Sequence, residues 1–257
     1  MRRLSELGGK RIPFLRWSVL RMIFGARHLL TNWQVGDGRE EALAAWVAAR
    51  ARARDLDDAI RVIDEFCYQQ SIMMNVGDEK GAILDRAVQR ARPRRLLELG
   101  TYCGYSALRM ARVMPPEGRI HSIEFSDANA RIARRIWDHA GIGDQATVVV
   151  GTLGDGGRTI ARLEAEHGFS SGSLDFVFVD HDKAAYLADL RRILAREWLH
   201  AGSIVVADNV KLPGAPDYRA YMRDEEGRRW RTVEHETHLE YQSLLKDLVL
   251  ESEYLGR

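Results

Sequence analysis

The chain has little cysteine, little lysine and almost no net charge. Its 257 residues include two cysteines, Cys67 and Cys103, which are too few for a disulfide scaffold or a zinc cluster. We therefore expect two reduced thiols in a cytoplasmic protein. The 38 basic and 37 acidic residues leave a formal charge of +1, so no basic surplus supports nucleic-acid binding.

Long apolar runs are also missing. Apolar side chains in residues 1–30 are interrupted by seven basic residues and one acid, Glu6, so the uninterrupted run that a transmembrane helix needs is missing, and a cleavable signal peptide is poorly matched. The pattern predicts a basic amphipathic helix within an N-terminal extension over residues 1–38. This helix either lies peripherally on the anionic inner face of the membrane or packs on the rest of the chain or on a second subunit. Monomer and homodimer both stay open.

Residues 39–257 are predicted to form one α/β domain, with a helical cap over 39–92 and a Rossmann-like core over 93–257. Apolar spacing predicts cap helices over 40–54, 56–70 and 78–91. In the core, short apolar runs alternate with helical segments, which is typical of strands buried on both faces of a parallel sheet. The runs cover 96–99, 120–125, 147–150, 174–179 and 204–207. The tail from Trp230 to Tyr254 predicts an antiparallel pair at one edge of this doubly wound sheet.

Ligands of such sheets bind beyond the carboxyl ends of the strands. The loop from Glu98 to Ser106 follows the first strand, and it lacks the GxGxxG pattern of nicotinamide dinucleotide sites. Glu98 would repel a pyrophosphate but suits a positively charged cofactor. Glu124 ends the second strand, 24 residues after Gly100, where a carboxylate typically binds ribose hydroxyls. Together these acids point to S-adenosylmethionine, which carries an ammonium and a sulfonium.

A second group of polar residues follows two later strands. Asp180 ends the run over 174–179, and Asp208 and Asn209 end the run over 204–207. If these strands are neighbours, two carboxylates and one amide converge at the same edge of the sheet. Oxygen ligands with open water positions suit Mg²⁺, a hard octahedral ion.

These residues belong to longer motifs that closely resemble catechol O-methyltransferase. The resemblance runs from about Leu56 to the C-terminus. Its motifs are Met73 to Asp78, Lys80-Gly81, Glu98 to Gly100, Tyr102 to Ser106, Asp180-His181, Ala207 to Val210, Pro213-Gly214 and Leu239 to Tyr241. The resemblance implies the seven-stranded class I methyltransferase fold, S-adenosylmethionine, Mg²⁺ and a catechol-type small-molecule substrate.

The resemblance also implies roles for individual residues. Asp180, Asp208 and Asn209 match the metal ligands, Lys183 matches the general base, and Glu240 matches the acid that holds the second substrate hydroxyl. The positions expected at the cofactor are Met74, Asn75, Val76, Glu98, Gly100, Tyr102, Ser106, Glu124, Phe125, Leu153, Asp180 and His181. Glu98 is expected at the methionine amino group, Glu124 at the ribose, and His181 at the adenine.

The substrate side departs from the family pattern. Lys183, Asn209, Pro213 and Glu240 are expected at the substrate, as in the family. Ile72 and Asp182 stand where tryptophans are expected, so the pocket is predicted to be more open and more acidic. The substrate is then larger than a simple catechol or carries a cation.

Other functions remain as alternatives. A caffeoyl-coenzyme-A-type O-methyltransferase shares the metal-dependent chemistry but matches less of the chain. A noncatalytic ligand-binding or membrane-scaffold module could use the same fold, although the retained acids and lysine argue against it. A nicotinamide oxidoreductase is disfavoured because GxGxxG is absent.

Overall fold

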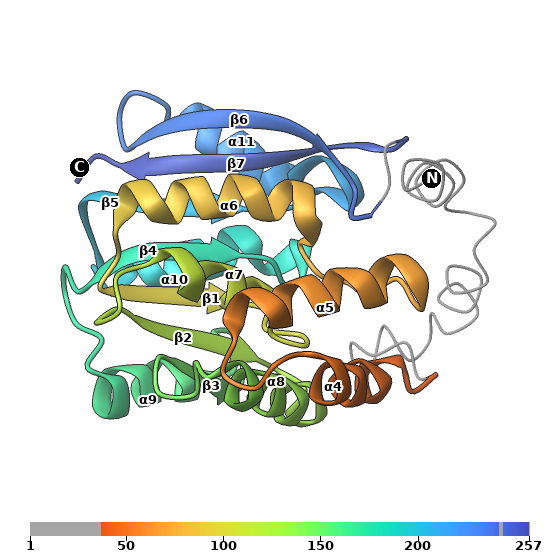
Figure 1. Ribbon diagram of the computed structural model, residues 1–257. Coiled ribbons are helices and arrows are strands. Elements are labelled where there is room, and N and C mark those ends of the chain that lie inside the picture. The colour runs from red at the N-terminus through yellow and green to blue at the C-terminus, as the bar shows by residue number, and fades with distance from the viewer. Residues whose placement is uncertain (1–36, 242–243, 257) are drawn as a thin grey trace.

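A mixed sheet runs through the molecule (Figure 1). The computed structural model describes residues 37–241 and 244–256, and within them seven strands form this sheet. The strands are β1 (Arg95–Leu99), β2 (Arg119–Glu124), β3 (Ala146–Val150), β4 (Leu174–Val179), β5 (Leu199–Ala207), β6 (Trp230–His238) and β7 (Lys246–Tyr254). Their order is β3-β2-β1-β4-β5-β7-β6. The strands from β3 to β5 pair in parallel, and β7 pairs antiparallel with both β5 and β6. The predicted doubly wound sheet with an antiparallel edge pair is therefore confirmed.

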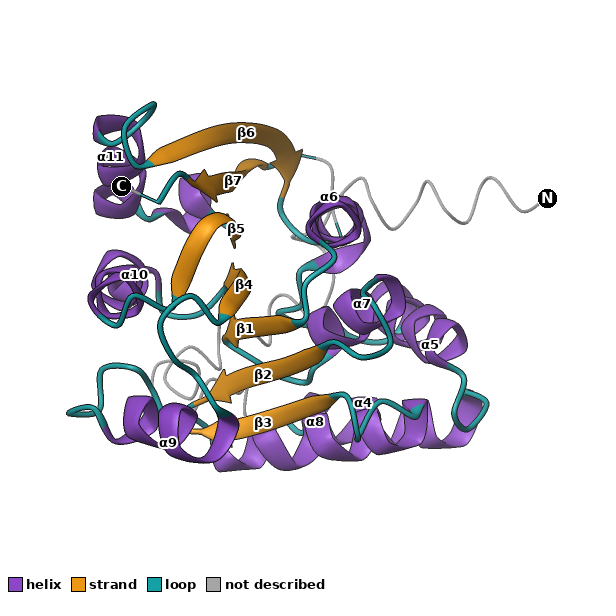
Figure 2. Cartoon of the chain, turned by 90° about the vertical axis from the view of Figure 1, so that its left-hand side faces the viewer, coloured by secondary structure: helices purple, strands orange, loops and turns teal. Residues whose placement is uncertain are grey.

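Helices cover both faces of the sheet, as Figure 2 shows edge-on. One face carries α4 (Arg39–Arg50), α5 (Leu56–Gln69), α6 (Gly77–Ala91), α7 (Tyr105–Val113) and α8 (Asp127–Ala140). The other carries α9 (Arg158–His167), α10 (Tyr186–Ala195) and α11 (Pro216–Asp224). The alternation of side chains along each strand supplies two cores. In β4, Phe176 and Phe178 join the first core, and Val177 and Val179 join the second.

Two local predictions differ from the structure. The helix predicted over 40–54 ends at Arg50, because Ala51 is extended and the Arg52 backbone N–H donates to Asp58 Oδ2 at 2.8 Å. The segment after β5 contains an irregular turn over Val210–Gly214 and then α11, neither of which was predicted. Pro216 begins α11 at a position where a missing N–H costs no helical hydrogen bond.

The predicted N-terminal amphipathic helix over residues 1–30 lies outside the described residues. Among the helices over 37–241, none combines the length and the apolarity needed to span a bilayer. The three cap helices over 39–91 pack against the same core as α7 and α8.

The sheet order brings distant parts of the chain to one edge. The connections leave β1 toward β2 and leave β4 toward β5, so the order reverses between β1 and β4. Ligands of doubly wound sheets bind at such a switch point. The antiparallel direction of β7 places its first residues beside the end of β5, since Ala207 pairs with Leu250. Residues near Gly100, Asp180, Asp208 and Asp247 therefore meet at this edge.

Candidate active site

A cavity of about 610 Å³ opens at the carboxyl ends of β1, β2, β4 and β5. Most residues predicted to bind cofactor, metal or substrate line it. They are Ile72, Met74, Asn75, Gly100, Tyr102, Glu124, Phe125, Leu153, Asp180, His181, Asp182, Lys183, Asn209, Pro213 and Glu240. The fold thus brings residues as far apart in the sequence as Ile72 and Glu240 around one cavity.

Gly100 follows β1 directly and lies close to the backbone of Asp180, which follows β4. Its φ is +100°, and a Cβ placed there would lie 2.2 Å from the Asp180 carbonyl oxygen. Only glycine satisfies both conditions, because it has no Cβ and tolerates positive φ. The close approach continues the ladder between the strands, in which the Asp180 N–H donates to the Leu99 carbonyl oxygen at 2.9 Å.

Glu124 ends β2 and organises the loops at the cofactor side of the cavity. Its Oε2 accepts the Tyr102 N–H and its Oε1 accepts the Ser126 N–H, each at 2.8 Å. Burial raises the pKa of Glu124, and these hydrogen bonds oppose the rise by stabilising the carboxylate. The carboxylate is therefore held rigidly at the wall of the cavity.

Four predicted site residues do not line the cavity, namely Val76, Glu98, Ser106 and Asp208. Val76 precedes α6 and is buried. Glu98 is fully buried within β1, and its two oxygens accept the hydroxyls of Ser106 and Ser122. Burial raises the pKa of Glu98 to about 8. The structure thus gives Glu98 and Ser106 a mutual contact behind the glycine loop, and their contact with a cofactor stays a prediction.

His181 lines the cavity with its ring held from two sides. Its Nε2 lies 2.8 Å from Asp189 Oδ2, and the ring stacks on Tyr186 with centroids 5.2 Å apart. The ring is thereby oriented before any ligand binds. Its expected contact with adenine is not tested by these distances and stays a prediction.

Lys183 is held by two neighbours at the other end of the cavity. Its Nζ donates to Asp180 Oδ1 at 2.9 Å and to the Tyr186 hydroxyl at 2.6 Å. The Tyr186 hydroxyl in turn donates to the Asp208 carbonyl oxygen at 3.0 Å. Tyr186 is fully buried and is not among the predicted site residues. One feature of the sequence could have indicated Tyr186: it lies three residues after Lys183, at the start of α10.

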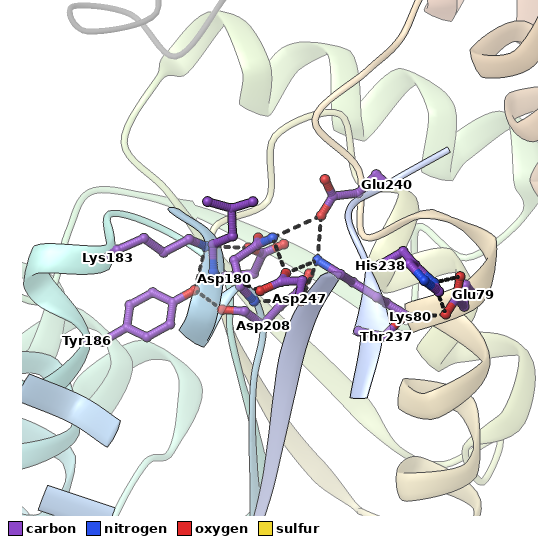
Figure 3. A network of polar contacts seen from close by, with 12 residues as sticks. Glu79, Lys80, Asp180, Lys183, Tyr186, Asp208, Thr237, His238, Glu240 and Asp247 are labelled. Carbon is purple, nitrogen blue, oxygen red and sulfur yellow. Dashed lines mark hydrogen bonds and ion pairs between the residues drawn. The ribbon is translucent and has the colours of Figure 1, made fainter. Parts of the chain in front are cut away.

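A buried network lies beside Lys183 and contains a second lysine (Figure 3). Lys80 Nζ lies 2.9 Å from Asp208 Oδ1, 2.7 Å from Glu240 Oε1 and 2.7 Å from Asp247 Oδ2. The Asn209 Nδ2 donates to Asp247 Oδ2 at 2.8 Å and to Glu240 Oε1 at 3.1 Å. Segments from α6, β5, β7 and the loop after β6 are therefore joined in one network.

The charges of this network fit a divalent cation. Two lysines, Lys80 and Lys183, contact four carboxylates, which leaves a formal charge of −2. Asp208 Oδ2 is buried and has no hydrogen-bond partner among the described residues. Burial raises the pKa of Asp208 to about 7; Lys80 lowers it and Asp180 raises it further. A dication at the unpartnered oxygen would reverse this rise.

The donor set is nevertheless small. Within residues 37–241 and 244–256, no three His, Cys, Asp or Glu side chains are grouped as a metal site. If Asp180, Asp208 and Asn209 held a cation, they would supply two carboxylates and an amide oxygen and leave further positions for water or substrate. Mg²⁺ commonly keeps several such positions open.

The part of the cavity where the sequence predicts the substrate has few aromatic walls. Ile72 and Pro213 line it, together with Leu239. Asp182 is exposed at the mouth, where its Oδ1 accepts the Ala184 N–H at 3.1 Å. The two positions that depart from the family pattern, Ile72 and Asp182, therefore both face the cavity.

Two charged residues of the network are not among the predicted site residues. Lys80 belongs to one of the sequence motifs but has no role assigned there, and Asp247 lies outside all of them. Lys80 occupies the buried face of α6, where Leu84, Ala87 and Val88 follow at helical spacing. A lysine on an apolar stripe is the available signal for it. Asp247 offers no comparable signal, because its importance depends on the pairing of β7 with β5.

The sheet order and the cavity at the switch point are those of the class I methyltransferase fold. A solved structure of the O-methyltransferase TomG from Streptomyces achromogenes, in complex with SAM, superposes with a TM-score of 0.61. That match covers 94% of this chain and 100% of that one, at 20% sequence identity, and it shows the shared fold.

Sequence comparisons define the family. The model of a family described as O-methyltransferase matches residues 53–227. A probable O-methyltransferase of Mycobacterium tuberculosis is 61% identical over 235 residues, covering 91% of this chain and all of that protein. Catechol O-methyltransferase B of Danio rerio is 40% identical over 218 residues, covering 85% of this chain and 80% of that protein. The chain belongs to the O-methyltransferase family.

Proposed function

We propose that this protein transfers a methyl group from S-adenosylmethionine to one hydroxyl of a catechol-type substrate, with Mg²⁺ held by Asp180, Asp208 and Asn209. One observation carries the proposal: a single cavity is lined by Gly100 and Glu124 at one end and by Lys183, Asn209 and Glu240 at the other. A cofactor and a hydroxylated substrate bound in one cavity meet without leaving the protein. The 40% identity with a catechol O-methyltransferase supports the substrate class.

Binding of the cofactor is assigned to the loops after β1 and β2. Gly100 allows close approach to the backbone, and Glu124 offers a preoriented carboxylate for the ribose hydroxyls. His181 offers a fixed ring at the same cavity. These groups would hold the cofactor in the same cavity as Lys183, and orientation of two bound reactants can supply about 7–11 kcal/mol of the rate enhancement.

Lys183 is proposed to accept the proton of the reacting hydroxyl at Nζ. A neutral amine has two N–H donors and one lone pair. With the donors directed at Asp180 Oδ1 and the Tyr186 hydroxyl, the lone pair remains for the substrate proton. Mg²⁺ bound nearby would favour the ionised form of a coordinated hydroxyl, whose free pKa is about 10 as in tyrosine.

The second hydroxyl is proposed to bind Glu240. Its Oε1 is held by Lys80 and Asn209, while Oε2 has no partner in the described part of the chain and can accept a substrate hydrogen bond. The ionised first oxygen then attacks the sulfonium methyl. The new oxygen–carbon bond forms as the sulfur–carbon bond breaks, and the sulfur leaves as the neutral thioether of S-adenosylhomocysteine.

The test measures methyl transfer by the full chain to catechol and to phenol as a matched monohydroxyl control. We expect a mass gain of one methyl group on catechol and none on phenol. On asymmetric catechols we expect a mixture of meta and para products, because Ile72 and Asp182 lack the aromatic contacts, worth about 0.5–1.5 kcal/mol, that favour one ring orientation. Preferred transfer to a coenzyme A thioester would instead favour the caffeoyl-coenzyme-A type.

Metal dependence is tested on the same reaction. Exhaustive chelation should abolish turnover and leave affinity for S-adenosylmethionine nearly unchanged, since the proposed cofactor contacts use no metal ligand other than Asp180. Readdition of Mg²⁺ should restore turnover. Full activity in the chelated enzyme would reject the metal assignment.

A further inference from the structure

Lys80 is an almost completely buried lysine for which the proposed reaction has no direct use. Its side chain is 1% exposed, and its ammonium group contacts carboxylates from three separate segments. Removing a charge from water costs several kcal/mol, which its partners offset only with good geometry. An apolar residue would fill this position on the buried face of α6 without that cost. The position of the charge therefore calls for an explanation beyond packing.

The contacts of Lys80 use one oxygen of Asp208 and one oxygen of Glu240 and do not involve the other oxygen of either residue. Asp208 Oδ1 forms an ion pair with Lys80 Nζ at 2.9 Å and accepts the Asn209 N–H at 2.6 Å, and Oδ2 is left without a hydrogen-bond partner among residues 37–241 and 244–256. Glu240 uses Oε1 for Lys80 and Asn209, and its Oε2 is free of both. Figure 3 shows Glu240 contacting the network through one oxygen, with the other turned away. Lys80 thus determines which oxygen of Asp208 and which oxygen of Glu240 is left for a ligand.

Asp247 makes the same selection at Asn209. The Asn209 Nδ2 donates to Asp247 Oδ2 and Glu240 Oε1. A reversed amide would set its carbonyl oxygen against two carboxylates, so the orientation is determined and Oδ1 is left for a cation. Asp247 Oδ1 also accepts the Leu212 N–H at 2.9 Å, which ties down the segment before Pro213. Asp247 is itself held by Lys80 at 2.7 Å.

We propose that Lys80 and Asp247 form a positioning pair that aims Asp208 Oδ2 and Asn209 Oδ1 at the metal and Glu240 Oε2 at the substrate. The inference rests on the proposed function, because it assumes that a divalent cation binds there. In this inference, Lys80 on α6 and Asp247 at the start of β7 orient the side chains that follow β5 and β6. Neither positioning residue lines the cavity at the side of the cofactor.

The test is metal binding by the intact protein without substrate, measured by calorimetry with Mg²⁺ and by electron paramagnetic resonance with Mn²⁺. Asp247→Asn exchanges one atom and sets an amide N–H against Lys80 and Asn209; Lys80→Met removes the ammonium at similar length. Both should weaken metal binding about 10–100-fold, as loss of partners behind metal ligands typically does. Affinity for S-adenosylmethionine should change less than twofold. Lys246→Met, at an exposed position beside Asp247, is the control and should bind metal normally.

A measurement on the unmodified protein keeps the test independent of variant folding. The chain has five lysines, so their side-chain ammonium signals can be resolved by nitrogen-15 NMR. The Lys80 signal, assigned by its loss in Lys80→Arg, should shift when Mg²⁺ is added. A purely structural ion pair predicts unchanged metal affinity in folded Asp247→Asn and Lys80→Met, and that result would overturn the inference; an unmoved Lys80 signal in metal-bound wild-type protein would overturn it as well. Failure of the wild-type protein to bind either metal would instead overturn the proposed function.

Discussion

The two ends of the cavity are built in different ways. At the proposed cofactor end, Glu124 contacts the N–H groups of Ser126 and Tyr102, which lie 2 and 22 residues away along the chain. At the proposed metal and substrate end, Lys80 meets Asp208, Glu240 and Asp247, which lie more than a hundred residues away. The cofactor end depends on loop conformation, whereas the other end depends on the packing of α6, β5 and β7.

The electrostatic demands of the two ends explain this difference. A cofactor that is large and partly apolar is held by loops that need few buried charges. A divalent cation needs several carboxylates in one place, and these repel each other unless cations lie between them. Lys80 supplies such a cation between Asp208, Glu240 and Asp247. The metal end must therefore draw on helices and strands that are distant in sequence.

The largest expected effect is a loss of turnover without a loss of cofactor binding, which distinguishes the two ends of the cavity. Lys183→Met should lower kcat about 10²–10⁴-fold, because the proposed proton acceptor is lost, while cofactor affinity stays within twofold. Single-turnover kinetics and calorimetry check the two parts. Lys183→Arg keeps the charge but cannot accept a proton at neutral pH, so it should be equally slow. Lys211→Met, at an exposed position, is the matched control. Near-normal turnover in Lys183→Met would show that no lysine base is needed.

A smaller effect is expected from a substitution at Gly100, which lies between the two ends of the cavity and should therefore change both. Gly100→Ala would place a Cβ 2.2 Å from the Asp180 carbonyl oxygen, at a φ of +100°. We expect a loss of about 2–4 kcal/mol in the free energy of unfolding and weaker binding of both cofactor and metal. Gly156→Ala has a comparable φ of +79° but no atom within 4 Å of the added Cβ, so it should lose only about 1 kcal/mol. Equal losses in the two variants would contradict the proposed close approach.

The smallest effect concerns Asp64, which links the two ends behind the cavity. Its Oδ1 accepts the hydroxyl of Tyr105 on α7 at 2.7 Å and that of Tyr241, next to Glu240, at 3.2 Å. Burial raises the pKa of Asp64 from 3.8 to about 6. Between these values the native state binds a proton that the unfolded state has lost, so the free energy of unfolding falls as pH rises from about 4 to about 6.

Asp64→Asn should remove that part of the pH dependence. Relative to wild type, the variant should gain about 1–2 kcal/mol in the free energy of unfolding between pH 4 and pH 6.5. Urea denaturation at several pH values checks this. Asp57→Asn changes a carboxylate on the same helix whose side chain is 78% exposed, and it should run parallel to wild type. Parallel profiles for Asp64→Asn as well would contradict the titration of Asp64 in this range.

The fold and most of the cavity lining could be predicted from the sequence alone. Apolar runs such as Leu174–Val179 are buried on both faces of the sheet, and this pattern indicates parallel strands whatever their order. Because site residues follow the ends of such strands, the pattern is enough to place Gly100, Glu124 and Asp180 at one edge, and all three line the cavity. The sequence by itself determined these features, since each apolar run and the site residue that ends or follows it are adjacent along the chain.

Only the tertiary structure decided the contacts between elements that are distant in the sequence. Asp247 reaches Asn209 because β7 runs antiparallel to β5, and a change in that pairing register by one residue would turn its side chain to the other face. Glu98 does not line the cavity, because the hydroxyls of Ser106 and Ser122 hold it inside β1, and its contact with a cofactor stays a prediction. The apolar stripe of α6 indicates that Lys80 is buried, but it does not indicate which side chains surround the ammonium group. Its burial among three carboxylates follows from the packing of α6 against two strands, which no local pattern encodes.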